Sequence, residues 1–308
     1  MMIPRNYSFC AFLFALLPLH AVAGKHDYED EGDYEERSVS ESAPMAENGT
    51  LDVSNVAGEV LISGWDRNEI EVKGELGYGQ KLDFSADGDH ARVEVRWERD
   101  HEDEDEEANI LISVPKTSRV RATTVSASII VRDVTEELQL RSVSGDVTAH
   151  VYAADVNIGT ISGTLQITGN KQAAEMMLSV VSGDAWVRDI DGDLTARTVS
   201  GDINIRAGKL RRTRIDTTSG DVLLRASLES DARFEVDSTS GDLRLELCGK
   251  PEAEYELSSF SGDIVAFDRH GEARNEYGPT SDLRFKLGTG SALVRIDSLS
   301  GEISLDDC

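Results

Sequence analysis

Apolar residues recur two positions apart along most of the chain, in short runs on either side of a recurring Ser-Gly-Asp tripeptide. With the glycine as position zero, positions +2 and +4 are apolar in almost every unit, as in Ile203 and Ile205. Positions −7 and −5 are usually apolar too, as in Leu194 and Ala196. Alternation with a period of two predicts strands with one buried face. Each unit therefore predicts two short strands, one before and one after the tripeptide.

The tripeptide returns at a nearly constant spacing. The glycines at 145, 163, 183, 201, 220, 241, 262 and 301 are separated by 18, 20, 18, 19, 21, 21 and 39 residues. The last gap is interpreted as two units, with Ser281 in place of a glycine, and Ala127 and Gly58 occupy the same place upstream. A period near 20 is typical of a solenoid. The complete tripeptides, interpreted as a structural corner repeat, are Ser144, Gly145, Asp146; Ser182, Gly183, Asp184; Ser200, Gly201, Asp202; Ser219, Gly220, Asp221; Ser240, Gly241, Asp242; and Ser261, Gly262, Asp263.

Backbone sterics explain this tripeptide as a corner between two strands. Glycine supplies a bend or a positive φ at the lowest cost, and the flanking serine and aspartate can hydrogen-bond to the backbone of the bend. Position −3 is nearly always Ser or Thr and has the parity of the buried positions. It predicts an inward column of hydroxyl groups.

A single unit cannot bury its apolar face, whereas a stack of units buries a continuous core. The predicted fold is all-β, a parallel β-solenoid (single-stranded β-helix-like) of about ten coils with an irregular N-terminal cap. A helical fold is disfavoured because β-branched residues and glycines recur throughout. The expected organisation is a capping part at 50–119 and the repeat solenoid at 120–308.

The first residues predict export. Arg5 precedes an apolar run that ends in Ala21-Val22-Ala23, the pattern of a secretory signal peptide at 1–23 with cleavage between Ala23 and Gly24. Residues 24–49 are acidic, have no apolar periodicity and predict a disordered linker. The formal net charge of −27 argues against a nucleic-acid partner, since phosphates are repelled.

Several outward positions are candidates for binding. The acidic +1 column raises the alternative of calcium, but it offers about one carboxylate per coil, so no metal site is predicted and no cofactor is expected. Position +5 carries Arg188, Arg206 and Arg225, which either pair with neighbouring carboxylates or bind an anionic glycan or lipid headgroup. Trp186 lies beside Arg188 at +3, where an exposed ring can stack on a sugar.

Cys248 and Cys308 both fall at position +7, three coils apart if the coils stack in sequence order. That separation is roughly 14 Å, beyond the Cα distance of about 7 Å that a disulfide tolerates. Whether these cysteines are free is left open, as is an intermolecular disulfide through Cys308.

No catalytic residues are predicted. The histidines are scattered, and no G-x-S-x-G, H-E-x-x-H or P-loop pattern occurs. A carbohydrate lyase remains the enzymatic alternative, because some parallel β-helices have that activity.

The segments SNVAGEVLISGWDRNEIEV and ILISVPK, followed by tandem VSGD units, resemble the bacterial "putative adhesin" β-strand-repeat family, a domain of unknown function. The resemblance covers about residues 50 to 308. It implies an envelope-associated β-solenoid with no established catalytic residues.

These patterns predict an exported, non-catalytic β-solenoid that acts as an envelope binding or structural module, periplasmic or at the cell surface. It is either adhesin-like or a periplasmic scaffold, with envelope proteins or surface glycans as partners and no transmembrane segment after signal removal. The alternative is a polysaccharide-binding or polysaccharide-cleaving β-helix protein.

Overall fold

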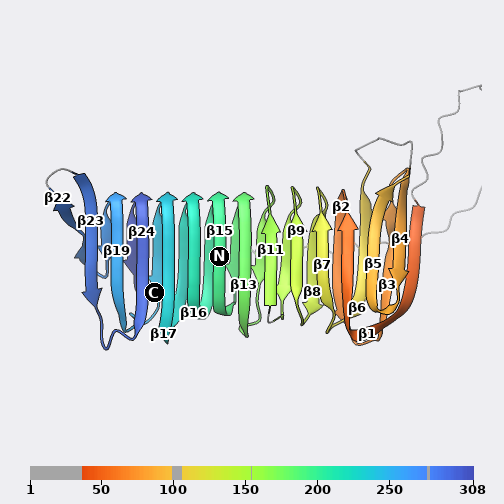
Figure 1. Cartoon of the computed structure of the whole chain (residues 1–308), viewed down its shortest axis with the longest axis horizontal. Coiled ribbons are helices and arrows are strands. Elements are labelled where there is room, and N and C mark those ends of the chain that lie inside the picture. Colours follow the sequence, from red (N-terminus) through yellow and green to blue (C-terminus); the bar gives the residue numbers. More distant parts are fainter. Residues whose placement is uncertain (1–36, 99–105, 154, 276–277) are drawn as a thin grey trace, which may run out of the picture. The chain divides into compact units, whose positions relative to one another are not determined.

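The computed structural model describes residues 37–98, 106–153, 155–275 and 278–308, which belong to one compact unit, Glu35–Cys308. All regular elements in these ranges are β-strands (Figure 1). The prediction of an all-β, mainly parallel fold is confirmed. Because the described ranges contain no helix, no helix there could cross a membrane.

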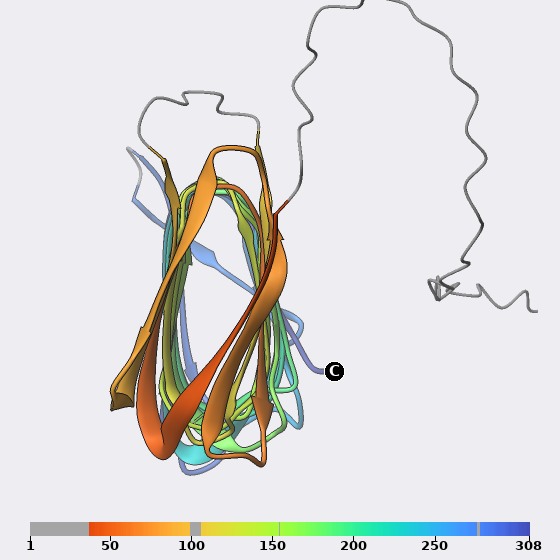
Figure 2. The ribbon, with the colours of Figure 1, turned by 90° about the vertical axis from the view of Figure 1, so that its right-hand side faces the viewer.

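The strands form two facing rows, seen edge-on in Figure 2. The pre-corner row holds strands that precede a corner, in the spatial order β4 (Gln80–Ala86), β5 (Gly88–Trp97), β1 (Arg37–Asn55), β7 (Arg119–Thr124), β9 (Leu138–Ser142), β11 (Asp155–Thr160), β13 (Ala173–Ser182), β15 (Asp191–Ser200), β16 (Ile203–Ser219), β17 (Val222–Ser240), β24 (Ala292–Ser300), β19 (Ala253–Ser261), β23 (Gly278–Lys286) and β22 (Glu272–Asn275).

The post-corner row holds strands that follow a corner. Its spatial order is the first half of β1, β3 (Glu69–Leu76), β6 (Ala108–Pro115), β2 (Gly58–Trp65), β8 (Ser128–Val134), β10 (Val147–Val151), β12 (Leu165–Thr168), β14 (Ala185–Arg188), the first halves of β16 and β17, β18 (Leu243–Leu247), β25 (Ile303–Asp306), β20 (Ile264–Ala266) and β21 (Arg269–His270).

Parallel pairing in register places equivalent positions of neighbouring coils side by side. Ile203, for example, lies between Ala185 and Val222, and all three are buried. The core between the rows is built from the +2, +4, −5 and −7 columns, as predicted. Each large side chain removed from water contributes about 1.5–3 kcal/mol, so the repeated columns hold the stack together.

The corner glycines are required by close stacking as much as by the bend. A Cβ built on Gly220 would lie 2.2 Å from the carbonyl oxygen of Gly201, and one on Gly201 would lie 2.1 Å from that of Gly183. Gly220 also has a φ of 121°, which side-chain-bearing residues rarely adopt. The glycine column therefore lets each corner rest on the one before it.

The predicted hydroxyl column at position −3 is confirmed. Thr124 donates to Ser142 across neighbouring coils at 3.0 Å, and the Ser142 hydroxyl accepts the N–H of Gly145 at 2.8 Å. Thr160 accepts the N–H of Gly163 in the same way. These buried hydroxyls satisfy corner amides that point away from the strand ladders.

The coils do not stack in sequence order at the C-terminal end. The coil of β24 and β25 lies between the coil of β17 and β18 and the coil of β19 and β20, although it follows both in the sequence (Figure 1). The prediction of a corner at Ser281 is wrong. Ser281 lies in β23, which pairs antiparallel with β19 and covers the stack, so Asp282 does not belong to the +1 column.

The N-terminal end shows the same exchange. The coil of β1 and β2 lies between the coil of β5 and β6 and the coil of β7 and β8. The first half of β1 then crosses to the other row, where it pairs antiparallel with β3 (Figure 2). The irregular part of the expected cap contains a hairpin of β4 with β5.

The prediction of a disordered linker at 24–49 is wrong for residues 37–49, which lie in β1. Their side chains show little apolar periodicity, but pairing with β3 satisfies their backbone groups. Residues 24–36, the signal peptide expected at 1–23, the Ala23–Gly24 cleavage site and the acidic residues 99–105 lie outside the described residues.

Candidate functional site

A row of apolar side chains stands on the surface beside the corners of the pre-corner row. These residues occupy position −2, directly after the buried hydroxyl column, so strand alternation points them outward. We call this row the ridge; in spatial order it comprises Val56, Val125, Val143, Ile161, Val181, Val199, Thr218, Thr239, Leu299 and Phe260.

The ridge is exposed along its whole length. Its eight apolar members range from 37% exposed at Val56 to 53% at Leu299 and Phe260. Nine strand spacings give the ridge a length of about 43 Å. Single exposed apolar residues are ordinary, but a continuous line of them is typical of an interaction surface.

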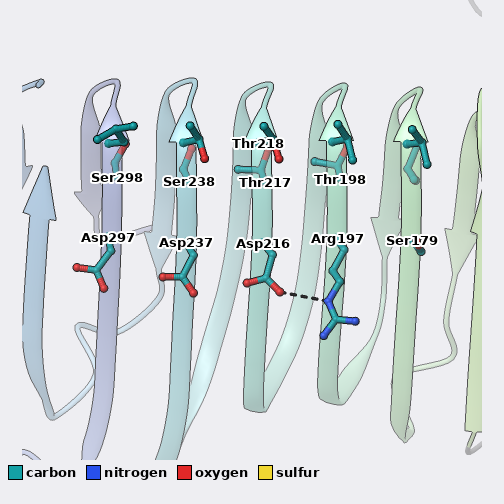
Figure 3. Close-up of a pocket in the computed structure, with 15 residues that line it drawn as sticks. Ser179, Arg197, Thr198, Asp216, Thr217, Thr218, Asp237, Ser238, Asp297 and Ser298 are labelled. Atoms are coloured by element: carbon teal, nitrogen blue, oxygen red, sulfur yellow. Dashed lines mark hydrogen bonds and ion pairs between the residues drawn. The ribbon is translucent and has the colours of Figure 1, made fainter. Parts of the chain in front are cut away.

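An open groove of about 630 Å³ runs along the C-terminal half of the ridge, and we call it the acidic groove. One side is formed by ridge residues from Val181 to Leu299. The opposite side is the position −4 row, which Figure 3 shows across neighbouring strands as Ser179, Arg197, Asp216, Asp237 and Asp297.

Arginines neutralise the carboxylates of the acidic groove unevenly. Arg197 pairs with Asp216 at 3.2 Å, and Arg214 contacts Asp216, Glu235 and Asp237 at 2.8–3.2 Å. Partial burial raises the pKa of Asp237; Arg214 opposes this shift, while the Asp216 and Asp297 carboxylates add to it. Arg295 pairs with Asp297 at 2.7 Å, so each of the three aspartates of the groove has a guanidinium partner, and Asp237 is the one whose pKa is raised.

The predicted arginine column lies on the opposite, post-corner row. Arg225 pairs with Glu246 at 3.4 Å, as one of the two interpretations expected. Arg188 instead donates from Nε to the Thr168 hydroxyl at 2.9 Å, and neither Arg188 nor Arg206 makes an ion pair among the described residues. Trp186 is 51% exposed beside them.

The aspartates of the corner repeat connect successive coils. A carboxylate oxygen of each accepts the backbone N–H of the equivalent residue in the next coil at 2.8–3.0 Å. The acceptors are Asp146, Asp184, Asp202, Asp221 and Asp242. Hydrogen bonding between coils thus accounts for this column, and the described residues contain no group of three or more side chains suited to a metal ion.

Titratable side chains do not assemble into a catalytic constellation in the described ranges. His90 Nε2 lies 3.2 Å from an Asp52 carboxylate oxygen at the surface of the N-terminal coils, and this pair includes no nucleophile. His150 lies on the post-corner row near Trp186, far along the stack from His270 in β21.

Cys248 and Cys308 form a disulfide, with Cα atoms 4.8 Å apart. The predicted separation of three coils is wrong because it assumed stacking in sequence order. The exchanged coil brings the two +7 positions into adjacent coils. The disulfide could not be predicted because the sequence pattern does not give the order of the coils.

Sequence reasoning also missed the ridge. Its signal is the residue before Ser-Gly, which is Val, Ile, Leu or Phe in most units. Strand alternation points this residue outward, and no role was predicted for it.

The model of one protein family, Toastrack DUF4097, matches residues 48–251. No curated protein matches the chain. Among solved structures, a "putative cell adhesion protein" from Clostridium sporogenes is 9% identical, with a TM-score of 0.23, and covers 89% of this chain and 100% of its own.

Two structures from Parabacteroides distasonis are also similar. One, described as a "putative lipid binding protein", is 9% identical with a TM-score of 0.38, covering 88% of this chain and 95% of its own. The other, a "putative adhesin", is 12% identical with a TM-score of 0.27, covering 68% and 93%.

Proposed function

This chain belongs to the Toastrack DUF4097 family, and from that premise we propose that it is an exported, non-catalytic binding module of the bacterial envelope whose ridge docks a protein partner. The observation that carries the proposal is the ridge itself. Six consecutive coils, from Val56 to Val199, present an exposed β-branched aliphatic side chain at the same position. Exposing them costs solubility without stabilising the core, which is typical of a docking surface.

The shape of the ridge favours a long partner over a small ligand. It is a straight line rather than an enclosed pocket, and its side chains offer no hydrogen-bonding groups at the six aliphatic positions. An extended or helical protein segment with a matching apolar stripe would bury it. Beside the acidic groove, such a segment would place a basic side chain opposite Asp237.

Two other occupants are less suited to the charge of the molecule. A second copy would bring two chains of formal charge −27 together. An anionic membrane would be repelled by the same charge and by the carboxylates next to the ridge.

The disulfide supports export. Disulfides persist in oxidising compartments, which agrees with the signal peptide expected at 1–23. Within the envelope, we favour a periplasmic scaffold over an adhesin, because the aliphatic ridge suits a protein segment better than a surface glycan.

We also propose that the chain divides into an N-terminal cap, which includes residues 37–49 of β1 and reaches to residue 119, and a repeat solenoid from residue 120, with about ten coils in total. The antiparallel strands β3 and β4 support a distinct N-terminal cap. The regular parallel register from β7 to β17 supports a uniform repeat, in which the corner tripeptides have a structural role.

Site-specific photo-crosslinking in the native cell tests the ridge. A photoreactive residue at Val199 is expected to cross-link to one protein partner. The double variant Ile161→Asp, Val181→Asp should abolish that cross-link, because two charges would be buried at the interface. The matched control is Leu111→Asp, which alters an apolar residue of similar exposure (40%) in the post-corner row.

The alternative occupants give different results. Concentration-dependent dimerisation that the double variant abolishes would identify a second copy and contradict the proposal. Flotation with vesicles would identify a membrane and contradict it as well. Unchanged cross-linking in the double variant would show that the ridge does not bind the partner.

Protease treatment of intact cells tests the location. Digestion from outside would support an adhesin-like role at the surface. Protection until the outer membrane is permeabilised would support the periplasmic scaffold.

A further inference from the structure

The middle of the post-corner row carries an aromatic platform that is separate from the ridge. Trp186 lies at the centre of the row in β14, with Gln166 of β12 and Asn204 of β16 directly beside it in register. Its neighbours along the strand, Ala185 and Val187, are 3% exposed and anchor β14 in the core. The indole is therefore held on a rigid surface while half of it remains open to solvent.

Two guanidinium groups border this platform. Arg188 and Arg206 are paired in register at position +5, one strand apart. Arg188 is oriented by its 2.9 Å hydrogen bond to Thr168, and neither guanidinium has a carboxylate partner in the described part of the chain. Arg225, one strand farther on, pairs with Glu246. The two arginines without a carboxylate partner thus lie on the tryptophan's own strand, β14, and on the adjacent strand, β16.

These side chains line one open groove of about 530 Å³, together with Thr148 and His150. The groove spans four strands, from β10 to β16, or about 14 Å. We propose that it is a binding site for a short acidic oligosaccharide, a chain of pyranose units that carry carboxylate groups.

Each group on the groove has a role in that recognition. The indole face offers an apolar, electron-rich surface on which the C–H face of a pyranose ring can stack. The amides of Gln166 and Asn204 supply both donors and acceptors for ring hydroxyls. Arg188 and Arg206, which both line the groove from adjacent strands, can bind carboxylates by charge-assisted hydrogen bonds.

Charge explains why the saccharide must be acidic. A neutral sugar would leave both guanidinium groups without a counter-charge, whereas a carboxylate on the ligand supplies one. Because the chain as a whole is strongly acidic, an anionic ligand is attracted only where cationic side chains gather, as at this pair.

Titration of the purified chain with galacturonate oligomers tests the site, with tryptophan fluorescence and calorimetry as readouts. Neutral galactose oligomers of the same length and inorganic phosphate serve as probes of the two parts of the site. We expect the acidic oligomer to bind at least about tenfold more tightly than either probe. Trp186→Ala should abolish binding, and the double variant Arg188→Gln, Arg206→Gln should remove the preference for the acidic oligomer.

Arg225→Gln is the matched control, since it changes the same column outside the groove and should leave binding unchanged. The ridge variant Ile161→Asp, Val181→Asp should also bind the oligomer normally, which separates this site from the proposed docking function. Three results would overturn the proposal: no binding of the acidic oligomer, equal binding by Trp186→Ala, or phosphate binding as tightly as the oligomer. All variants change exposed side chains, and circular dichroism checks that each one folds.

Discussion

The two ends of the stack reach the same topology by different chemistry. At the N-terminal end the coil of β1 and β2 lies inside that of β5 and β6, and at the C-terminal end the coil of β24 and β25 lies inside that of β19 and β20. In between, from β7 to β17, the coils follow the sequence. At each end, the outermost coil of the stack is followed as well as preceded by other coils in the sequence. It is therefore tied to the stack through both of its chain connections, which limits fraying of the exposed edge.

The ends differ in what fastens the exchanged coil. At the C-terminal end a disulfide links the coil of β24 and β25 to its inner neighbour, while Tyr255 and Phe267 of the outer coil and Phe285 of the covering strand β23 pack together with ring centroids 4.6–6.3 Å apart. At the N-terminal end Asn55 donates to the carbonyl oxygens of both Ala57 and Ala108 at 3.0 Å. A polar clamp thus holds one end, and a covalent bond with an aromatic cluster holds the other.

The largest expected effect concerns the regular middle. Gly220→Ala places a methyl group 2.2 Å from a backbone carbonyl that cannot move without disturbing the next coil, so we expect a loss of at least about 4 kcal/mol or no folded protein. Gly88→Ala, in the N-terminal hairpin, is the control. Gly88 also has a positive φ (97°), but a Cβ added there would have nothing within 4 Å, and its change should cost about 1–2 kcal/mol.

Thermal denaturation of both variants measures this difference. Equal destabilisation by the two changes would mean that backbone conformation alone, without stacking, requires the corner glycines.

The next effect concerns the C-terminal end alone. Replacing Cys248 and Cys308 by serine should cost about 2–4 kcal/mol, because the bond closes a long loop with a sequence separation of 60. Hydrogen exchange should then accelerate in β24 and β25 and stay unchanged in β1 and β2. Acceleration at both ends would show that the whole stack unfolds as one unit.

A smaller effect is expected at the N-terminal clamp. Asn55→Ala removes the amide that donates to the buried carbonyl oxygen of Ala108 and to the partly buried one of Ala57, which still accepts the backbone N–H of Ala108, so it should cost about 1–3 kcal/mol. Ser298→Ala is the matched control at the same −3 position of the C-terminal exchanged coil. Its buried hydroxyl has no hydrogen-bond partner among the described residues, so its loss should change the free energy of unfolding little. Equal costs would contradict the clamp.

The smallest effect separates two aspartates by pH. Burial pushes the pKa of Asp193 up, but Arg211 and Arg212 outweigh it and lower that pKa, whereas the pKa of Asp237 is raised. A lowered pKa contributes stability above the unfolded value of 3.8 that is lost as the pH falls through the folded value. Asp193→Asn should therefore destabilise at pH 7 by less than about 1 kcal/mol, and the difference should vanish near pH 2.

For Asp237 the sign is opposite. Its ionisation costs stability as the pH rises from the unfolded pKa through the folded one, so Asp237→Asn should be neutral or slightly stabilising at pH 7. Asp297→Asn should lower the pKa of Asp237, because the exchanged coil places those carboxylates side by side. NMR titration measures the order in which the two carboxylates are protonated as the pH falls. Protonation of Asp193 before Asp237 would contradict the expected order.

The periodic columns of the sequence were sufficient to predict strands, corners and the inward hydroxyls, because each column has a fixed parity relative to its glycine. They could not predict the order of the coils. Every coil presents nearly the same column to both neighbours: Gly301 rests on Gly241, and Gly262 rests on Gly301, in the same close contact. The wrong corner at Ser281 and the wrong cysteine separation both follow from this equivalence.

Of the candidate surfaces, the sequence predicted Trp186 and the arginine column but not which arginines are paired. Pairing depends on the residue one coil away, such as Glu246 beside Arg225, and therefore on register. The ridge could have been predicted from the sequence, since position −2 follows the inward position −3 and must therefore point outward. Its continuity across the exchanged coil, at Leu299, appears only in the structure.

The exchange at the C-terminal end also has a consequence for the order in which the chain folds. Residues 253–266 emerge before residues 292–306, yet in the folded chain the later segment pairs with β17 and β18. A chain that stacked in order of synthesis would have to move the earlier segment outward by one place before the later one could pair there. In such a stack Cys248 and Cys308 would lie two coils apart, so the disulfide forms only after the late segment has taken its inner position.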